Sequence, residues 1–368
     1  MLNENEPGPE LYPLLLRPEL HRRVWGGEKL APLYGEGVPV RGKPGEPVGE
    51  SWLLDGASVV TNGPLAGRTL AELAVELGSR LVGSEPFARY GARLPLLLKL
   101  LDADQPLSVQ VHPDDRYALA HEAASGHLGK SEAWYVLEAA AGASVLWGLE
   151  SPLTPAELER AAATGELPGL MQALPVAKGS VVVNPAGTLH AVGAGILLFE
   201  IQQSSDLTYR IYDYGRVGAD GQPRELHLTK AAAVADLTSA PHEPPAPVAL
   251  ADGWQRLVQR PEFVLDRLVL AGPGSSSSTD GVTGQVAPTS LETLTVIEGQ
   301  VTLTMNAGAS GSATSVRPQA PVPFESAVLG FGQTALLPAG LGRPYTLTGQ
   351  GVVLRGAVVK DAREPSDS

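Results

Sequence analysis

The chain repeats part of itself, and this repeat constrains its fold more than any other feature of the sequence. Residues 179–190 (GSVVVNPAGTLH) align without a gap on residues 332–343 (GQTALLPAGLGR), with a shared glycine, an apolar run and a Pro-Ala-Gly turn. Two shorter matches follow the same order along the chain, EAWYVLE with ETLTVIE and VQVHP with GQVAP. Three matches in one order indicate two copies of a single structural module.

Each module is predicted to consist mainly of β-strands. Short runs rich in Val, Leu and Ile are bounded by Gly, Pro or Asp, which is typical of a β-rich fold with many turns. The predicted strands include residues 95–103, 106–112, 132–139, 180–186 and 195–203. Helices are fewer and are predicted at residues 68–77, 154–164 and 227–237. The second begins with Thr154, Pro155 and Glu157, the residues of a capping box.

Length favours two domains, since 368 residues exceed the usual size of one. The Pro-rich stretch SAPHEPPAPVA (239–249) is typical of a linker, so we predict domains at residues 1–240 and 241–368. Residues 273–281 and 306–323, rich in Gly, Ser and Pro, are predicted to be loops.

Composition excludes several classes of function. The absence of cysteine rules out disulfides, thiolate catalysis and zinc sites built on sulfur. A formal charge of −13 without a basic stripe argues against a nucleic-acid partner. No apolar run approaches the roughly 18 residues of a membrane span, and the start lacks the features of a signal peptide. We expect a soluble cytoplasmic protein, a monomer or weak homo-oligomer, that contacts no membrane.

A metal site is the strongest chemical prediction. Side chains alternate along a strand, so Gln110 and His112 share one face about 7 Å apart, although such a pattern also suits the polar side of a half-buried strand. Folded as a small barrel, the first module would add Glu132 and His190. Two histidines and a carboxylate with open positions suit a catalytic ion, Zn²⁺ or also Fe²⁺ or Mn²⁺, with Gln110 as a fourth, neutral ligand.

The second module has lost this set of residues. Ala287 stands where the first module has His112, and Arg343 stands where it has His190. Glu292 is retained, which shows that a carboxylate at this position does not require histidines. We predict that the second module is free of metal.

The remaining histidines are not predicted to bind metal. Two of them, His121 and His127, lie in a stretch expected to be a helix end and loop, and we predict that both are exposed to solvent. The other three have no partner at metal-ligand spacing and are predicted to be structural: His21, His227 and His242.

Charged residues cluster after the last predicted metal ligand, in EIQQSSDLTYRIYDYGR. Burial of Glu200 inside a barrel would raise its pKa and suit it to carry a proton. Arg210 could bind an anion or stabilise negative charge on an oxygen, or it could instead pair with Asp206. Lys99 and Lys130 could supply a positive field around a phosphate.

The chain resembles the type I mannose-6-phosphate isomerases, particularly the short bacterial form. The likeness lies in VWGGEKL, GESWLLDG, PLLLKLLDADQPLSVQVHPDD, GKSEAWYVL and NPAGTLHAVGAGILLFEIQQSSDLTYRIYDYGR, and it extends weakly into the C-terminal module. It implies a mainly β fold of two cupin barrels (double-stranded β-helix, jelly-roll). A few helices would pack on the N-terminal barrel, and the C-terminal one would be metal-free.

The resemblance also implies roles for individual residues. One Zn²⁺ per chain would be held by Gln110, His112, Glu132 and His190. The residues implied in catalysis are Arg210, Glu200 and Lys130. Those implied in binding the substrate are Lys99, Asp206 and Lys130.

The implied reaction interconverts D-mannose 6-phosphate and D-fructose 6-phosphate. A proton would move between C1 and C2 through a cis-enediolate, and a hydride shift is the rival mechanism. Two other functions are compatible with the same residues: an Fe(II)-dependent cupin dioxygenase and a non-catalytic sugar-binding protein with two cupins.

Overall fold

The computed structural model describes residues 10–272, 281–306 and 324–359. The predicted loops at 273–281 and 306–323 lie outside the described residues, apart from Gly281 and Asn306.

Contacts between residues divide the chain into two compact units, which we call the central unit and the C-terminal unit. The central unit comprises Pro18–Asp55 and Leu96–Pro247. The C-terminal unit comprises Met1–Arg17, Gly56–Pro95 and Val248–Ser368. Two early segments are therefore grouped with the second module. The predicted division at residue 240 stays a prediction, because grouping by contacts does not test which part folds independently.

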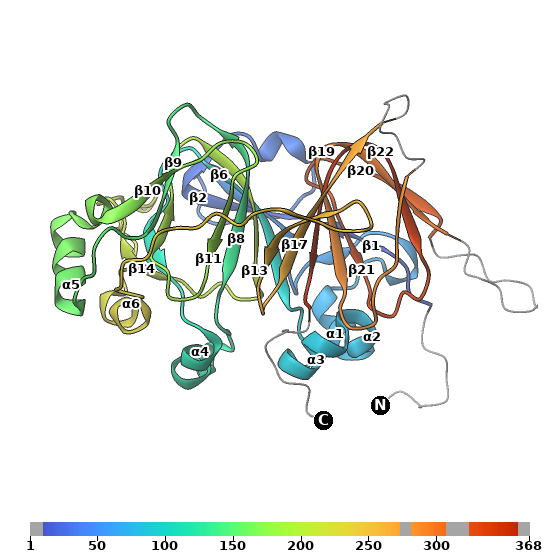
Figure 1. Cartoon of the computed structure of the whole chain (residues 1–368), viewed down its shortest axis with the longest axis horizontal. Coiled ribbons are helices and arrows are strands. Elements are labelled where there is room, and N and C mark those ends of the chain that lie inside the picture. Colours follow the sequence, from blue (N-terminus) through green and yellow to red (C-terminus); the bar gives the residue numbers. More distant parts are fainter. Residues whose placement is uncertain (1–9, 273–280, 307–323, 360–368) are drawn as a thin grey trace, which may run out of the picture. The chain divides into compact units, whose positions relative to one another are not determined.

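The C-terminal unit contains one ten-stranded antiparallel sheet (Figure 1). Its main order is β15 (Val248–Ala249), β16 (Gln255–Gln259), β17 (Val264–Ala271), β22 (Tyr345–Ala357), β19 (Glu292–Met305), β21 (Thr334–Leu337), β1 (Leu14–Arg17) and β5 (Val59–Val60). Strand β18 (Val282–Gly284) pairs with β22, and β20 (Ser326–Gly330) pairs with β19. Its helices are α1 (Leu70–Leu77), α2 (Ser79–Val82), α3 (Ser84–Tyr90) and the 3₁₀ turn η2 (Gly63–Leu65).

The central unit contains two sheets. The five-stranded sheet runs β10 (Met171–Pro175), β9 (Ser144–Leu149), β12 (His190–Val192), β7 (Val109–Val111), β14 (Tyr209–Tyr212). The seven-stranded sheet runs β11 (Val181–Asn184), β8 (Glu132–Ala139), β13 (Ile196–Gln203), β6 (Leu96–Ala103), β4 (Val48–Leu54), β2 (Glu19–Gly27), β3 (Val40–Arg41). Its helices are α4 (Asp115–His121), α5 (Pro155–Thr164), α6 (Leu228–Val234) and the 3₁₀ turns η1 (Ala31–Leu33), η3 (Ala123–Ser125) and η4 (Leu167–Leu170).

Two hydrophobic clusters fix the layers of the central unit. One joins the two sheets, with Trp134 from β8 packed near Val145 of β9 and Val192 of β12. The other joins the five-stranded sheet to α5 and α6 and includes Val109 and Val111. The five-stranded sheet therefore has one face toward helices and one face toward the other sheet (Figure 1). A side chain on the inner face is enclosed between sheets, which is where the site lies.

The two modules pair their strands in the same register. In the central unit Glu132 of β8 lies opposite Asn184 of β11. In the C-terminal unit Glu292 of β19 lies opposite Leu337 of β21. These are the positions that the two sequence matches place in correspondence, so the predicted repeat is a repeat of structure as well.

The predicted strands and helices are all present, with some ends shifted. Helix α5 begins as predicted, with a capping box between Thr154 and Glu157. Helix α1 begins two residues later than predicted, at Leu70, because Thr69 is its N-cap. The predicted mainly β fold with few helices is confirmed. Among the described residues, none of the helices has the length and apolar character needed to cross a membrane.

Gly193 is a position where the fold tolerates no side chain. It directly follows β12, and a Cβ there would lie 2.0 Å from the carbonyl oxygen of Ser144 in β9. We expect Gly193→Ala to lower the free energy of unfolding by about 3 kcal/mol, since backbone must move to make room. Gly169→Ala is the control, because a Cβ there meets no atom within 4 Å, and it should cost less than about 1 kcal/mol. Urea unfolding followed by circular dichroism compares them, and equal stabilities would contradict the prediction.

Candidate active site

Three of the predicted site residues lie in one row across the five-stranded sheet. Gln110 of β7 is paired with His190 of β12 on one side and with Arg210 of β14 on the other. Residues directly opposite each other in an antiparallel pair point to the same face. Val109 and Val111 pack toward the helices, so this row faces the interior of the unit. As the alternation in VQVH predicts, the two valines and Gln110 lie on opposite faces of the strand.

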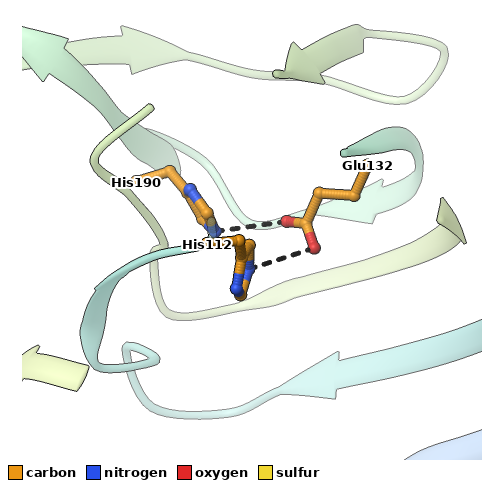
Figure 2. Close-up of side chains that lie close together, drawn as sticks. All are labelled: His112, Glu132 and His190. Carbon is orange, nitrogen blue, oxygen red and sulfur yellow. Dashed lines mark ion pairs between the residues drawn. The ribbon is translucent and has the colours of Figure 1, made fainter. Parts of the chain in front are cut away.

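Two histidines and one carboxylate meet on this inner face (Figure 2). The Nε2 atom of His112 lies 3.5 Å from Oε2 of Glu132, and Nε2 of His190 lies 3.2 Å from Oε1 of the same residue. One potential ligand atom from each residue lies within 4.8 Å of the others. All three side chains are at most 1% exposed, so water does not screen this group.

Hydrogen bonds orient both imidazole rings. The Nδ1–H group of His112 donates to the carbonyl oxygen of Leu207 at 2.8 Å, and that of His190 donates to the carbonyl of Thr188 at 2.8 Å. Each Nε2 atom therefore carries a lone pair directed at Glu132, as in histidines that bind metal. Nε2 of His112 is buried and has no hydrogen-bond partner. The donor set fits a divalent cation.

Electrostatics keep the group in the protonation state that a metal needs. Burial, followed by the charge of Lys130, lowers the pKa of His112 to about 3, so its ring is neutral. Burial alone would raise the pKa of Glu132, but the ammonium group of Lys130 and the two imidazoles hold it well below its usual range. Nζ of Lys130 lies 2.9 Å from Oε2 of Glu132. The carboxylate is ionised and the ring of His112 can act as a ligand.

Gln110 reaches the same group through its amide. Its Nε2 atom lies 3.2 Å from Nε2 of His190, to which it donates a hydrogen bond. An amide binds a cation through its oxygen, so ligation requires a half-turn of this side chain. The role of Gln110 as a fourth ligand stays a prediction.

A second row of side chains crosses the seven-stranded sheet. Glu200 of β13 is paired with Trp134 of β8 and with Lys99 of β6, and Lys99 is paired with Trp52 of β4. Nε1–H of Trp134 donates to Glu200 at 3.0 Å, while Nζ of Lys99 lies 3.5 Å from the same carboxylate. The ammonium group also lies 4.8 Å from the centre of the Trp52 ring. Burial, followed by the charge of Glu132, raises the pKa of Glu200, in the direction that the sequence predicts.

The other predicted residues line a pocket of about 460 Å³. Its lining includes Lys99, Gln110, Lys130, Glu200, Asp206 and Arg210. Of the two alternatives for Arg210, the ion pair with Asp206 is not formed, and Asp206 lies 3.6 Å from Nζ of Lys99 instead. Among the described residues Arg210 has no carboxylate within ion-pair distance, and its Nη1 donates to the carbonyl of Glu225 at 3.0 Å. Burial and the charge of Arg224 lower the pKa of Arg210 to about 10, which leaves it cationic.

Several residues of the pocket wall were not predicted from the sequence. These are Arg22, Arg23, Lys43, Glu46, Glu50, Arg224 and His227. The first five lie near the motifs VWGGEKL and GESWLLDG, which carried the family resemblance but no spacing that indicates a site. His227, which was predicted to be structural, is one of the residues that line the pocket. His21 stacks on Trp52 and His242 contacts Trp147.

The predicted exposure of the two histidines between the ligands holds for one of them. His121, the last residue of α4, is exposed, whereas His127 is half-buried. Neither belongs to the group of potential metal ligands.

Glu50 connects the basic residues of this wall. Its carboxylate accepts hydrogen bonds from Nη2 of Arg23 at 2.7 Å and from Nε1 of Trp52 at 2.8 Å. Burial alone would raise the pKa of Glu50, but the charges of Arg23 and Lys99 and the bond from Trp52 lower it far below its usual range. The carboxylate thus fixes one wall of the pocket while its charge remains buried.

Replacement of Glu50 should therefore cost stability in a pH-dependent way. We expect Glu50→Gln to lower the free energy of unfolding by about 2 kcal/mol at pH 7, because Arg23 loses a buried partner. Folding lowers the pKa of Glu50, so its contribution is complete above the ordinary glutamate pKa of about 4.3 and is lost as the pH falls further. The difference between wild type and variant should shrink below that pH in urea titrations.

Glu138→Gln is the matched control for this experiment. Glu138 forms an ion pair with Lys29 at 2.7 Å, but both side chains are about half exposed. Its loss should cost less than about 1 kcal/mol at any pH. An equal loss in the free energy of unfolding for both variants would show that the buried ion pair stabilises the fold no more than the exposed one.

Comparison with known proteins supports a single family. Residues 14–132 match the family model described as phosphomannose isomerase type I, catalytic domain. The mannose-6-phosphate isomerase of Streptococcus mutans is 36% identical over 297 residues, which cover 79% of this chain and 87% of that protein. The mannose-6-phosphate isomerase ManA of Bacillus subtilis is 43% identical over 233 residues, 62% of this chain and 70% of that protein.

A solved structure shows the same likeness in three dimensions. The crystal structure of the mannose 6-phosphate isomerase from Bacillus subtilis superposes with a TM-score of 0.76 at 30% identity. The match covers 94% of this chain and 99% of that one. It confirms the predicted cupin fold.

Proposed function

Because the chain belongs to the type I phosphomannose isomerase family, we propose that it interconverts mannose 6-phosphate and fructose 6-phosphate with one zinc ion per chain. The observation that carries the proposal is the buried group of His112, Glu132 and His190, with a basic pocket beside it. The names of the relatives favour an isomerase over a dioxygenase or a non-catalytic sugar-binding protein. A cytoplasmic location and a monomeric or weakly oligomeric state stay predictions.

The metal would be held by the Nε2 atoms of the two histidines and by Glu132, with Gln110 as a possible fourth ligand through its amide oxygen. When bound, such an ion supplies Lewis-acid stabilisation to oxygens that become negatively charged. Lys130, 2.9 Å from Glu132, lines the pocket next to this group. We propose that Lys130 also contacts the substrate, since it borders both the metal ligands and the cavity.

The chain's own residues account for the movement of the proton. In the open-chain aldose a base removes the proton from C2, and the electron pair that remains forms the C1–C2 double bond of a cis-enediolate. The negative charge moves to O1, and a proton then passes from O2 to O1. Return of the carried proton to C1 gives the C2 carbonyl of the ketose. Glu200 is the proposed proton carrier, because it is buried, lines the pocket and has a raised pKa.

Positive charge in the pocket suits a phosphorylated substrate. Arg210 has no acidic partner among the described residues and can meet an anion or the charge of the enediolate. Lys99 is shared between Glu200 and Asp206, so the two carboxylates hold its ammonium group at the pocket wall. We propose that Lys99 and Asp206 contact the sugar phosphate there.

Zinc content tests the metal assignment. After chelation and reloading we expect about one Zn²⁺ per chain and restored turnover in a coupled assay. Glu132→Gln should weaken zinc binding by more than about 100-fold, beyond the usual cost of losing a residue that only supports a ligand. Glu292→Gln, the equivalent change in the second module, is the control and should alter neither zinc content nor turnover. Full zinc occupancy in Glu132→Gln would refute the site.

Solvent labelling tests the enediolate. If mannose 6-phosphate is converted in deuterated water, the proton that reaches C1 should be partly exchanged, and deuterium should appear at C1 of fructose 6-phosphate in the NMR spectrum. A hydride shift keeps the original hydrogen on the sugar. Absence of label at C1, even at low conversion, would favour that rival.

A further inference from the structure

Besides its pairing with β7, Arg210 is hydrogen-bonded to His227 and to a residue close to it in the chain. The main-chain N–H of Arg210 donates to Nδ1 of His227 at 3.2 Å, and the main-chain N–H of His227 donates back to the carbonyl of Arg210 at 2.7 Å. Nη1 of Arg210 donates to the carbonyl of Glu225 at 3.0 Å. Three hydrogen bonds thus connect one residue of β14 to the segment Glu225–His227.

The position of Arg210 in its sheet explains why such support matters. Strand β14 is at the edge of the five-stranded sheet and pairs only with β7 within it. The register between these strands shifts directly after Arg210, so the ladder is interrupted there. A residue at an irregular edge is held less firmly than one between two paired strands. The contacts from His227 replace the neighbouring strand that β14 lacks.

His227 directs its ring at Arg210 instead of at its own helix. It is the N-cap residue of α6, a position where Asn, Asp, Ser or Thr usually bind the helix N-terminus through the side chain. No side-chain cap bond is formed by His227. Its Nδ1 atom accepts from Arg210, which places the remaining ring proton on Nε2.

The segment before His227 is itself anchored. The carboxylate of Asp213, which is 6% exposed, accepts hydrogen bonds from Nε of Arg224 at 2.7 Å and from Nε of Arg216 at 3.2 Å. Arg224 directly precedes Glu225, whose carbonyl binds the guanidinium of Arg210. The support is therefore connected to a buried ion pair and is not a free loop.

We propose that His227 is a positioning residue for Arg210: it fixes the backbone of β14 so that the guanidinium points into the pocket. The inference rests on the active-site role of Arg210 in the proposed function. His227 lines the pocket, and in this proposal it acts through Arg210 and not on the reacting atoms. Its loss should therefore change the same kinetic parameter, kcat or KM, that loss of Arg210 changes.

A double-mutant cycle tests this proposal. His227→Leu removes the acceptor at similar size and should lower kcat/KM by about tenfold, in the parameter that Arg210→Ala affects. His227→Asn keeps an oxygen near the place of Nδ1 and should remain within about threefold of wild type. In the Arg210→Ala background, His227→Leu should change kcat/KM by less than about twofold. Thermal melting of each variant shows whether the fold is intact.

The outcomes separate the inference from the proposed function. If His227→Leu lowers kcat/KM equally with and without Arg210, or if the Asn and Leu variants lose activity in parallel with stability, His227 has only a structural role. If Arg210→Ala alone leaves turnover unchanged, the assigned role of Arg210 fails first. If Arg210→Ala abolishes turnover and His227→Leu has no effect, the inference alone is overturned.

Discussion

The buried charge of Glu132 is the interaction on which the site depends. A carboxylate enclosed between two sheets loses its hydration and must be compensated by positive charge or hydrogen bonds. Here Lys130 lies 2.9 Å away and two imidazoles direct lone pairs at the same group. Lone pairs and a carboxylate repel one another unless a cation lies among them. The arrangement is therefore one that a metal ion completes, and the strand register that produces it is a property of the whole module.

In the C-terminal unit, different groups compensate the corresponding buried carboxylate. Its carboxylate, Glu292, starts β19 just as Glu132 starts β8, but Tyr345 donates a hydrogen bond to it at 2.9 Å. Burial raises the pKa of Glu292, and the nearby charge of Arg355 opposes this. Arg355 is in turn bound to Asp266 at 2.9 Å. A hydroxyl group and a guanidinium thus occupy the role that histidines and a cation have in the other module. Because it lacks both histidines, the second module is still predicted to bind no metal.

The sequence predicted the parts of the site that follow from periodicity and repetition. Alternation in VQVH placed Gln110 and His112 on one face, and comparison of the modules marked His112 and His190 as the residues that differ. It could not predict that Arg23 and Glu50 line the same pocket, because nothing in their spacing relates them to Gln110 and Arg210 much later in the chain. The contact between His227 and Arg210 was not predicted for the same reason. This contact depends on how residues 213–227 fold back, and no local pattern encodes that path.

The two bonds between His227 and the main chain of Arg210 have a second consequence. The outer edge of β14 would otherwise expose unpaired N–H and C=O groups, which can recruit a strand from another molecule and begin aggregation. His227 uses the N–H and C=O groups of Arg210, so neither is left for an added strand at this residue. Resistance to aggregation and turnover would then both depend on the contact between His227 and Arg210, and a substitution of His227 would remove the half of it that the imidazole ring provides.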